Sequence, residues 1–174
     1  DRRSALGGRD CGAIGVSQAQ EAANSPFNWC SIMRNPRRVY DRELYTHFVT
    51  FSCYNRRKIL DHDVPKKMVL GTLNSTVHAQ TAKCVGFVIM PDHVHAALWF
   101  PKPGQLSRFL QIWKRQSSEQ IKRWYQRVEI EYFKIMGDDP IWQPKYYSFE
   151  IYSDFKLEEK LNYMHENPVR AGLV

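Results

Sequence analysis

The chain has 174 residues, of which 43% are hydrophobic and 13% aromatic, so it can build the core of one compact domain and is not disordered throughout. Its 25 Lys and Arg residues outnumber 18 Asp and Glu residues, and the net charge of +7 favours a polyanionic partner. No apolar run approaches the roughly 20 residues that a membrane span needs. The four cysteines are too widely spaced for a disulfide framework or a zinc knuckle. We therefore expect a cytoplasmic protein that does not enter a membrane.

The first 36 residues differ in composition from the rest of the chain. Asp1 to Pro36 is rich in Gly, Ala, Ser, Asn and Arg and shows no sustained apolar period. This segment also lacks the continuous apolar stretch of a signal peptide. We interpret it as a flexible basic leader and predict that the folded domain spans 37–174.

The first half of this domain predicts three strands and one helix. Leu44 to Tyr54 is dense in β-branched and aromatic residues, which favour a strand. Pro65 suits the first turn of a helix, and apolar residues at four-residue spacing continue that helix to about Gln80. Lys83 to Met90 and His93 to Phe100 then predict two strands that form a hairpin.

The second half predicts two helices around a fourth strand. A long amphipathic helix follows the third strand, and a strand-like segment is centred on Phe149 to Ile151. Ser153 or Asp154 can cap a last helix, which we expect to end by Asn167 because Pro168 disfavours helical geometry at the residue before it. The order β-α-β-β-α-β-α predicts an α+β fold, with a mostly antiparallel sheet and the helices packed on one side.

The third strand carries a pair of histidines. Because side chains alternate along a strand, His93 and His95 point to the same side. The opposite side is an apolar core face made of Val94, Ala96, Leu98 and Phe100. Two neighbouring imidazoles can chelate one divalent cation. The spacing alone leaves open the alternative of two surface histidines on a sheet.

The last helix has a chemically suggestive flank beside its apolar stripe. The helical period gives a buried stripe made of Leu157, Leu161 and Met164. A neighbouring flank gathers Lys156, Lys160, Tyr163 and Asn167. Lysines stabilise phosphate charge, a tyrosine can act as a nucleophile, and an asparagine offers an oxygen ligand. The alternative is an ordinary amphipathic helix with a tyrosine on its solvent side.

Four segments carry a family resemblance. In chain order they are VIMPDHVHAALWF, FLQIWKRQSSEQI, IWQPKYYSFEIYSD and LNYMHENPVRAGLV. Together they resemble the REP-associated tyrosine transposases, which are single-tyrosine HUH transposases of small bacterial insertion sequences. The resemblance covers nearly the whole predicted domain, from Arg37 to Val174. It implies a ferredoxin-like or RRM-like fold with the catalytic tyrosine on the C-terminal helix.

The resemblance also implies roles for individual residues. His93 and His95 match the histidines that hold a Mg²⁺ or Mn²⁺ ion on the scissile phosphate. Tyr163 matches the nucleophile that forms a 5′-phosphotyrosine link and frees a 3′-hydroxyl. Asn167 lies where related enzymes place a third, polar metal ligand. A free tyrosine has a pKa of about 10, so we expect Lys156 or Lys160 to favour the phenolate.

The implied substrate is DNA. The family cleaves and rejoins single strands beside imperfect palindromes that fold into hairpins, so we expect single-stranded and hairpin DNA as the partner and a nucleoid-associated location. The oligomeric state stays open between a monomer and a homodimer. Basic residues on the long helix can follow phosphates, and we predict DNA contacts by Lys114, Arg115, Lys122 and Arg123.

Two other functions compete with this interpretation. Nucleotide hydrolases of the histidine-triad kind also carry two histidines on a strand, but they need a third where this chain has Ala97. The stronger alternative is a domesticated, catalytically idle relative that binds hairpin DNA without cutting it. Metal-dependent cleavage separates the second alternative from a transposase.

Overall fold

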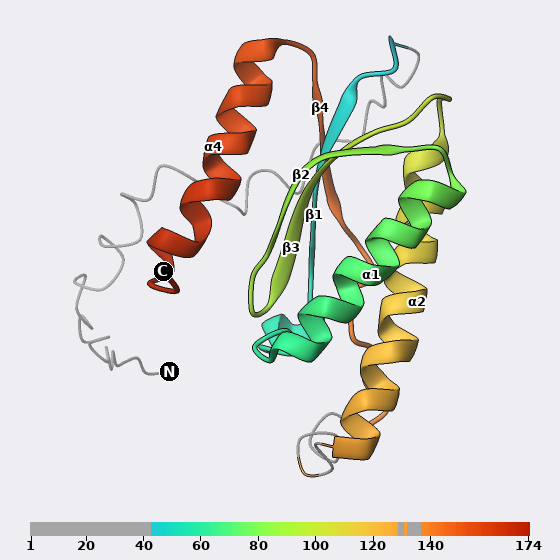
Figure 1. Cartoon of the computed structure of the whole chain (residues 1–174), viewed down its shortest axis with the longest axis vertical. Helices are drawn as coiled ribbons and strands as arrows, with labels where there is room; N and C mark the ends of the chain where they lie inside the picture. Colours follow the sequence, from blue (N-terminus) through green and yellow to red (C-terminus); the bar gives the residue numbers. More distant parts are fainter. Residues whose placement is uncertain (1–42, 129–130, 132–136) are drawn as a thin grey trace, which may run out of the picture. The chain divides into compact units, whose positions relative to one another are not determined.

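The computed structural model describes residues 43–128, 131 and 137–174 (Figure 1). The predicted leader, 1–36, and its boundary with the domain lie outside these residues. None of the helices in the described part of the chain is long and apolar enough to cross a membrane.

A four-stranded antiparallel sheet forms the centre of the domain, in the strand order β2-β3-β1-β4. The strands are β1 (Thr46–Ser52), β2 (Lys83–Ile89), β3 (His93–Trp99) and β4 (Tyr147–Ile151). The helices are α1 (Asp63–Ala79), α2 (Gln105–Val128) and α4 (Asp154–Arg170). The order β-α-β-β-α-β up to β4 is that of a ferredoxin-like fold, so the predicted class and sheet are confirmed.

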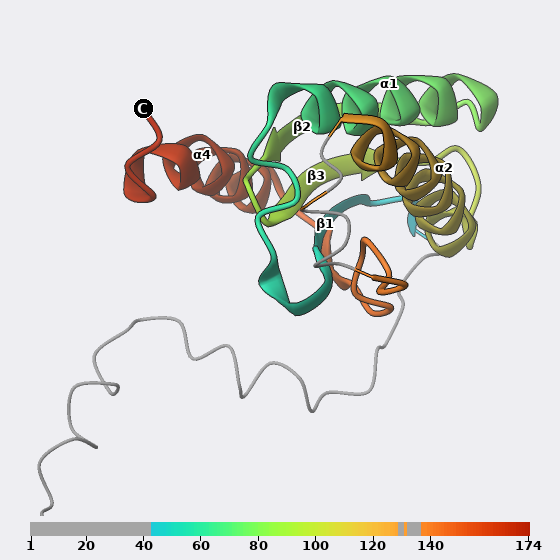
Figure 2. The same ribbon diagram turned by 90° about the horizontal axis from the view of Figure 1, so that it is seen from below.

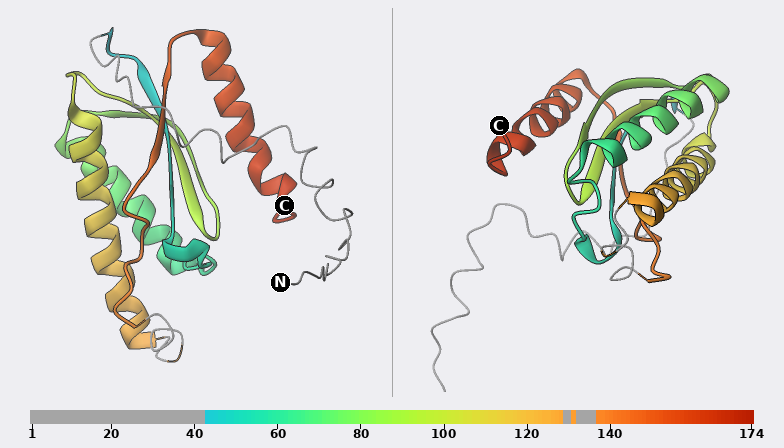
Figure 3. Two further views of the ribbon diagram at one scale, coloured as in Figure 1. Left: turned by 180° about the vertical axis from the view of Figure 1, so that it is seen from behind. Right: turned by 60° about the horizontal axis from the view of Figure 1, so that its bottom comes forward.

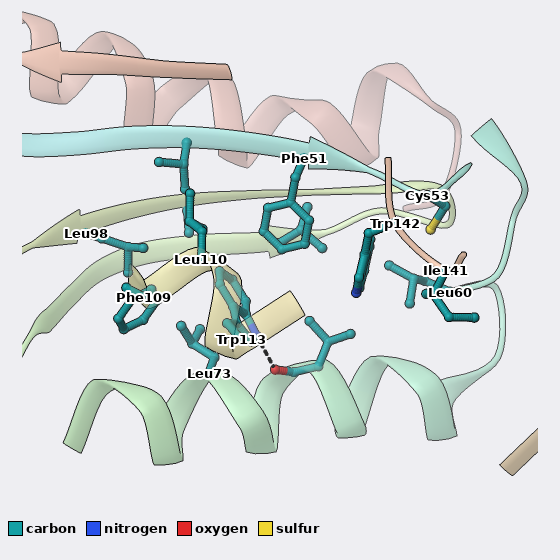
Figure 4. Packing of buried hydrophobic residues seen from close by; sticks show 14 of the residues in the cluster. Phe51, Cys53, Leu60, Leu73, Leu98, Phe109, Leu110, Trp113, Ile141 and Trp142 are labelled. Atoms are coloured by element: carbon teal, nitrogen blue, oxygen red, sulfur yellow. Dashed lines mark hydrogen bonds between the residues drawn. The ribbon is translucent and has the colours of Figure 1, made fainter. Parts of the chain in front are cut away.

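Helices α1 and α2 pack side by side on one face of the sheet, where they bury the main core (Figure 2). Val94, Ala96 and Leu98 lie in this core, as the alternation along the third strand predicts. Trp113 of α2 is fully buried, and its indole N–H donates to the carbonyl of Val69 on α1 over 2.9 Å (Figure 4). This bond satisfies the one polar atom of a large apolar side chain.

Helix α4 packs on the opposite face, so the prediction that the helices lie on one side is wrong for this helix (Figures 1 and 3). That face is also apolar, because Phe48, Ala97 and Ile151 lie on it. A sheet with two apolar faces must be covered on both. The predicted stripe of α4 supplies the cover through Leu157, Leu161 and Met164.

A glycine in β2 allows α4 to approach this closely. A Cβ atom at Gly86 would lie 2.9 Å from Leu161 Cδ2 and 3.3 Å from Met164 Cε. Both distances are shorter than ordinary van der Waals contact, so any larger residue makes the helix side chains move. The ends of the Leu161 and Met164 side chains therefore occupy the space that a side chain at position 86 would need.

The sequence predicts where α4 begins and where it ends, and only the predicted beginning is confirmed. Ser153 is the N-cap, and its Oγ accepts from the Lys156 N–H over 3.3 Å, as predicted. The predicted end at Asn167 is wrong, because the helix runs through Pro168 to Arg170. A proline this close to the C-terminus removes a single hydrogen bond, and the Ala171 N–H continues the helical pattern by donating to the Asn167 carbonyl over 3.0 Å.

Candidate active site

The histidine pair lies on the face of the sheet that α4 covers. His93 and His95 project from β3 to the same side, and their ring centroids are 4.7 Å apart with the planes at 83°. His95 is 1% exposed, and the side chain of His93 is 12% exposed. The two histidines therefore lie side by side as predicted, and they are more buried than histidines on a surface strand would be.

Each histidine has an oxygen partner at Nδ1. Thr50, which pairs with His95 across β1 and β3, places Oγ1 2.6 Å from the Nδ1 of that histidine. An Asp92 oxygen lies 2.5 Å from the Nδ1 of His93. An ionised carboxylate only accepts, so His93 donates from Nδ1 and presents a lone pair at Nε2. The threonine hydroxyl can donate or accept, and the tautomer of His95 that donates to it leaves a lone pair at Nε2, a buried atom with no hydrogen-bond partner in the described part of the chain.

The site keeps both imidazoles neutral. Burial is the largest cause that lowers the pKa of His93, and the hydrogen bond to Asp92 opposes it. Burial also lowers the pKa of His95, to about 3, with further contributions from the charges of His93 and Arg56. Neutral imidazole is the form that binds metal ions. Both side chains are thus ready to act as ligands at neutral pH.

Tyr163 reaches this pair from α4. Its ring lies 5.3 Å from the His95 ring, with the planes at 72°. The Phe48 ring stacks on His95 at 5.5 Å and meets the edge of Tyr163 at 6.1 Å. The three rings are thus in mutual contact. The structure brings His93, His95 and Tyr163 together.

Asn167 lies one turn after Tyr163, and its amide points back along its own helix. Its Nδ2 donates to the backbone carbonyl of Tyr163 over 2.8 Å, which leaves Oδ1 as the acceptor of the side chain. No group of three or more His, Cys, Asp or Glu side chains able to hold a metal occurs among the described residues.

Lys156 and Lys160 share one carboxylate. The Nζ of Lys156 lies 2.6 Å from one oxygen of Glu159, and the Nζ of Lys160 lies 2.9 Å from the other. The hydrogen bond to Glu159 is the largest cause that raises the pKa of Lys156. Lys160 Nζ also lies 5.6 Å from the centre of the Phe48 ring. Both lysines are held on the flank of Tyr163, with Glu159 as their described ion-pair partner.

The predicted DNA-binding residues lie on α2, across the sheet from Tyr163. Lys114 is half-buried, and its Nζ donates to the carbonyls of Gln143 and Pro144 over 2.6 and 3.1 Å. Burial lowers its pKa. This lysine therefore holds the segment around Gln143 and Pro144 against α2. Arg115 is exposed. Lys122 is half-buried, and Arg123 is exposed and lies 4.0 Å from Glu119.

Sequence reasoning missed the residues that support the histidines. Phe48 and Thr50 are two residues apart on β1, so their side chains lie on the same face of the sheet as the histidine pair. Asp92 precedes the third strand directly, and the sequence analysis assigned it no contact with a histidine. The alternation of the first strand was visible, but the strand register that places Thr50 beside His95 is a long-range pairing that one sequence does not reveal.

A divalent metal ion fits the donors described here. The two imidazoles lie beside each other, and the Nε2 of His95 is buried with no hydrogen-bond partner among the described residues. Each imidazole is oriented through its other nitrogen, which is the usual second contact of a metal-binding histidine.

Comparisons with known proteins give the family. Residues 41–167 match the sequence model of a family described as IS200-like transposases. No curated protein matches the chain. A solved REP-associated tyrosine transposase bound to a REP hairpin is 20% identical, with a TM-score of 0.62 over 80% of this chain and 76% of that one.

A second solved structure shares the fold more distantly. A protein of Deinococcus radiodurans R1 described as a transposase is 16% identical, with a TM-score of 0.51 over 76% of this chain and 96% of that one. At these identities the two likenesses show the fold alone. The family match extends over most of the chain, and the protein therefore belongs to the IS200-like transposase family.

Proposed function

We propose that this transposase cleaves and rejoins single-stranded DNA beside a hairpin through a covalent link between Tyr163 and the DNA. The observation that carries the proposal is the placement of the Tyr163 ring 5.3 Å from the ring of His95, whose Nε2 is buried and has no hydrogen-bond partner among the residues that the structure describes. The similar structure bound to a REP hairpin supports hairpin DNA as the partner.

The proposed reaction exchanges one ester for another. The phenolic oxygen of Tyr163 forms a bond to phosphorus, and the bond from phosphorus to the 3′-oxygen breaks. The phenol loses its proton, and the departing 3′-oxygen gains one to become a hydroxyl. The phosphotyrosine keeps the energy of the ester, so the reverse reaction rejoins strands without a nucleotide cofactor.

Mg²⁺ or Mn²⁺ is the cofactor that we propose for the site. His93 and His95 would hold the ion through their Nε2 atoms, and the Asn167 amide oxygen would be a third ligand. The bound ion supplies Lewis-acid polarisation of the phosphodiester. The residues themselves supply orientation, because Thr50 and Asp92 fix the rings of the two histidines.

Lys160 is the lysine that we propose as the electrostatic partner of the phenolate. Its Nζ lies over Phe48, the same ring that Tyr163 contacts. Lys156 lies one turn further back and shares Glu159 with it. If Lys160 favours the phenolate, Lys160→Met slows cleavage and raises the pH at which cleavage is half-maximal. An unchanged rate and pH profile would exclude Lys160 from this role.

Arg115, Lys122 and Arg123 remain proposed phosphate contacts on α2. They lie on a different face of the domain from Tyr163, so they would bind DNA away from the cleaved bond. Alanine variants at these positions should weaken hairpin binding and reduce its dependence on salt.

The experiment that tests the proposed function looks for a covalent adduct. Labelled hairpins with single-stranded flanks, taken from palindromes of the source genome, are incubated with the protein and Mg²⁺ or Mn²⁺ and separated on a denaturing gel. The wild-type protein should give an adduct that is lost in Tyr163→Phe and His93→Ala. Tyr152→Phe removes an exposed tyrosine just before α4 and should leave the adduct unchanged.

Hairpin binding without an adduct under either metal would contradict the proposed function. That result would instead indicate a catalytically idle protein that binds hairpin DNA.

A further inference from the structure

The turn that follows β1 has an unusual backbone. Asn55 and Arg56 have φ angles of 52° and 55°, in the left-handed region that residues with a Cβ atom rarely adopt. Two such residues in succession persist only where surrounding contacts hold them. The cause of this conformation is therefore to be sought in what the turn contacts.

Backbone hydrogen bonds fix this turn to the residues before the histidine pair. The Cys53 N–H donates to the Asp92 carbonyl over 2.8 Å, and the Leu60 N–H donates to the Pro91 carbonyl over 2.8 Å. Cys53 and Leu60 flank the turn and are fully buried. The strained segment is thus anchored at both ends to the turn between β2 and β3.

The anchored turn places the Arg56 side chain beside Asp92. Its Nε lies 3.0 Å from Asp92 Oδ2, and its Nη1 donates to the Ser52 hydroxyl over 2.9 Å. The other carboxylate oxygen of Asp92 is the partner of His93. A guanidinium, a carboxylate and an imidazole therefore stand in a row. These contacts use only part of the five-donor guanidinium, whose side chain is 59% exposed.

Arg56 places a positive charge close to the histidine pair, because it contacts the same carboxylate that His93 contacts. A cation at this distance also opposes the binding of a metal ion, unless an anion lies between them. Asp92 supplies one negative charge, which is less than the combined charge of Arg56 and a divalent ion, so a further anion would be attracted to the site.

We propose that Arg56 binds the phosphate of the DNA strand that lies at the histidine pair. The inference rests on the proposed function, because it assigns the phosphodiester that Tyr163 attacks as the ligand of this arginine. Arginine suits the role, since its planar fork pairs with two phosphate oxygens. The Arg56 side chain is 59% exposed beside Asp92, so its remaining donors are accessible to a phosphate.

The proposal is tested by replacing one charged phosphate of the DNA at a time with a neutral linkage. In a set of hairpins, each carries one methylphosphonate in its single-stranded flank, so one phosphate at a time loses its charge. Affinities are measured for Tyr163→Phe, which keeps the DNA uncut, and for Tyr163→Phe combined with Arg56→Ala. At one position, the methylphosphonate should weaken hairpin binding by Tyr163→Phe about tenfold or more. The same substitution should leave the affinity of the double variant unchanged.

Two controls exclude other causes. Arg127→Ala removes an exposed arginine from the last turn of α2 and should keep the sensitivity to that linkage. Arg56→Lys keeps the charge without the fork and should retain part of the sensitivity. If Arg56 only braces Asp92, Arg56→Ala weakens binding of every hairpin equally, which overturns the proposal. The proposal is also overturned if no single methylphosphonate weakens hairpin binding by Tyr163→Phe more than it weakens binding by the double variant.

The same hairpins separate this proposal from the proposed function. With wild-type protein and metal, the sensitive linkage should coincide with the bond that is cleaved. A sensitive linkage without an adduct would leave Arg56 as a phosphate ligand and refute the chemistry. An adduct without a sensitive linkage would refute the role of Arg56 alone.

Discussion

The Tyr163 ring meets the His95 ring edge to face, with the centroids 5.3 Å apart, although a helix and a strand separate the two residues in the sequence. The contact exists because α4 covers the second apolar face of the sheet. Phe48 contacts both rings from β1. The predictions below follow from this arrangement.

Thr50→Val removes the hydroxyl that orients His95 and nearly keeps its volume. The Nδ1 of His95 then loses its hydrogen-bond partner, and the ring is held less firmly in its orientation. We expect affinity for Mn²⁺ to fall about tenfold or more, as measured by calorimetric titration of the purified protein. Thr76→Val removes another buried hydroxyl, on α1, and should leave Mn²⁺ affinity unchanged. Equal losses in both variants would contradict this role of Thr50.

Acid should destabilise the metal-free protein through His95. Its pKa is about 3 in the folded protein against an ordinary value of 6.5, so the unfolded chain takes up the proton first as pH falls. The contribution to stability is complete above pH 6.5 and is lost between 6.5 and about 3, by at most about 1.4 kcal/mol per pH unit. Urea unfolding with a chelator present, at several pH values, measures this slope.

His95→Gln should flatten that dependence, because glutamine does not titrate. His78→Gln changes an exposed histidine on α1 and should leave the slope unchanged. A slope that survives in His95→Gln would show that other groups control acid stability.

Gly86→Val should separate folding from activity. The added side chain would press on Leu161 and Met164 and displace α4, with a cost of about 1–3 kcal/mol. Because Tyr163 lies on that helix, cleavage should fall by more than the loss of folded protein explains. Gly71→Ala, at an exposed position of α1 with no atom within 4 Å of the new Cβ, should instead stabilise by about 0.5–1 kcal/mol. Activity tracking the folded fraction in Gly86→Val would contradict the argument.

Lys114→Met should act on stability more than on DNA affinity. The variant leaves the carbonyls of Gln143 and Pro144 without their donor, at a cost of about 1–3 kcal/mol. Arg115→Ala, one residue further along α2, should show the opposite pattern. Thermal melting and hairpin titration of the two variants make the comparison. A stable Lys114→Met protein with weakened hairpin binding would restore Lys114 as a DNA contact.

Local patterns in the sequence were enough to predict the sheet and the histidine pair. The alternation in the third strand set His93 and His95 on one face and the core residues on the other. The helical period of the last helix gave its buried stripe and its polar flank. These features depend on residues close in sequence, so a single sequence reveals them.

The remaining features depend on contacts between distant segments. Nothing local states on which face of the sheet α4 packs, and the sequence analysis expected the wrong face. Pro168 has a local preference to end the helix, yet the helix continues through it to Arg170. The partners Thr50 and Phe48 follow from strand register, which pairing across the sheet decides. The hydrogen bonds from Lys114 to the carbonyls of Gln143 and Pro144 also join segments that are distant in sequence.

The most direct test of the central claim locates the DNA on the protein. After the cleavage reaction, the adduct is digested with nuclease and trypsin, and the peptides are identified by mass spectrometry. Tyr163 is the single tyrosine in the tryptic peptide 161–170, and the account predicts that this peptide carries the nucleotide on that residue. A nucleotide on peptide 146–156, which contains Tyr147 of β4, or no modified peptide in a reaction that cuts DNA, would contradict it.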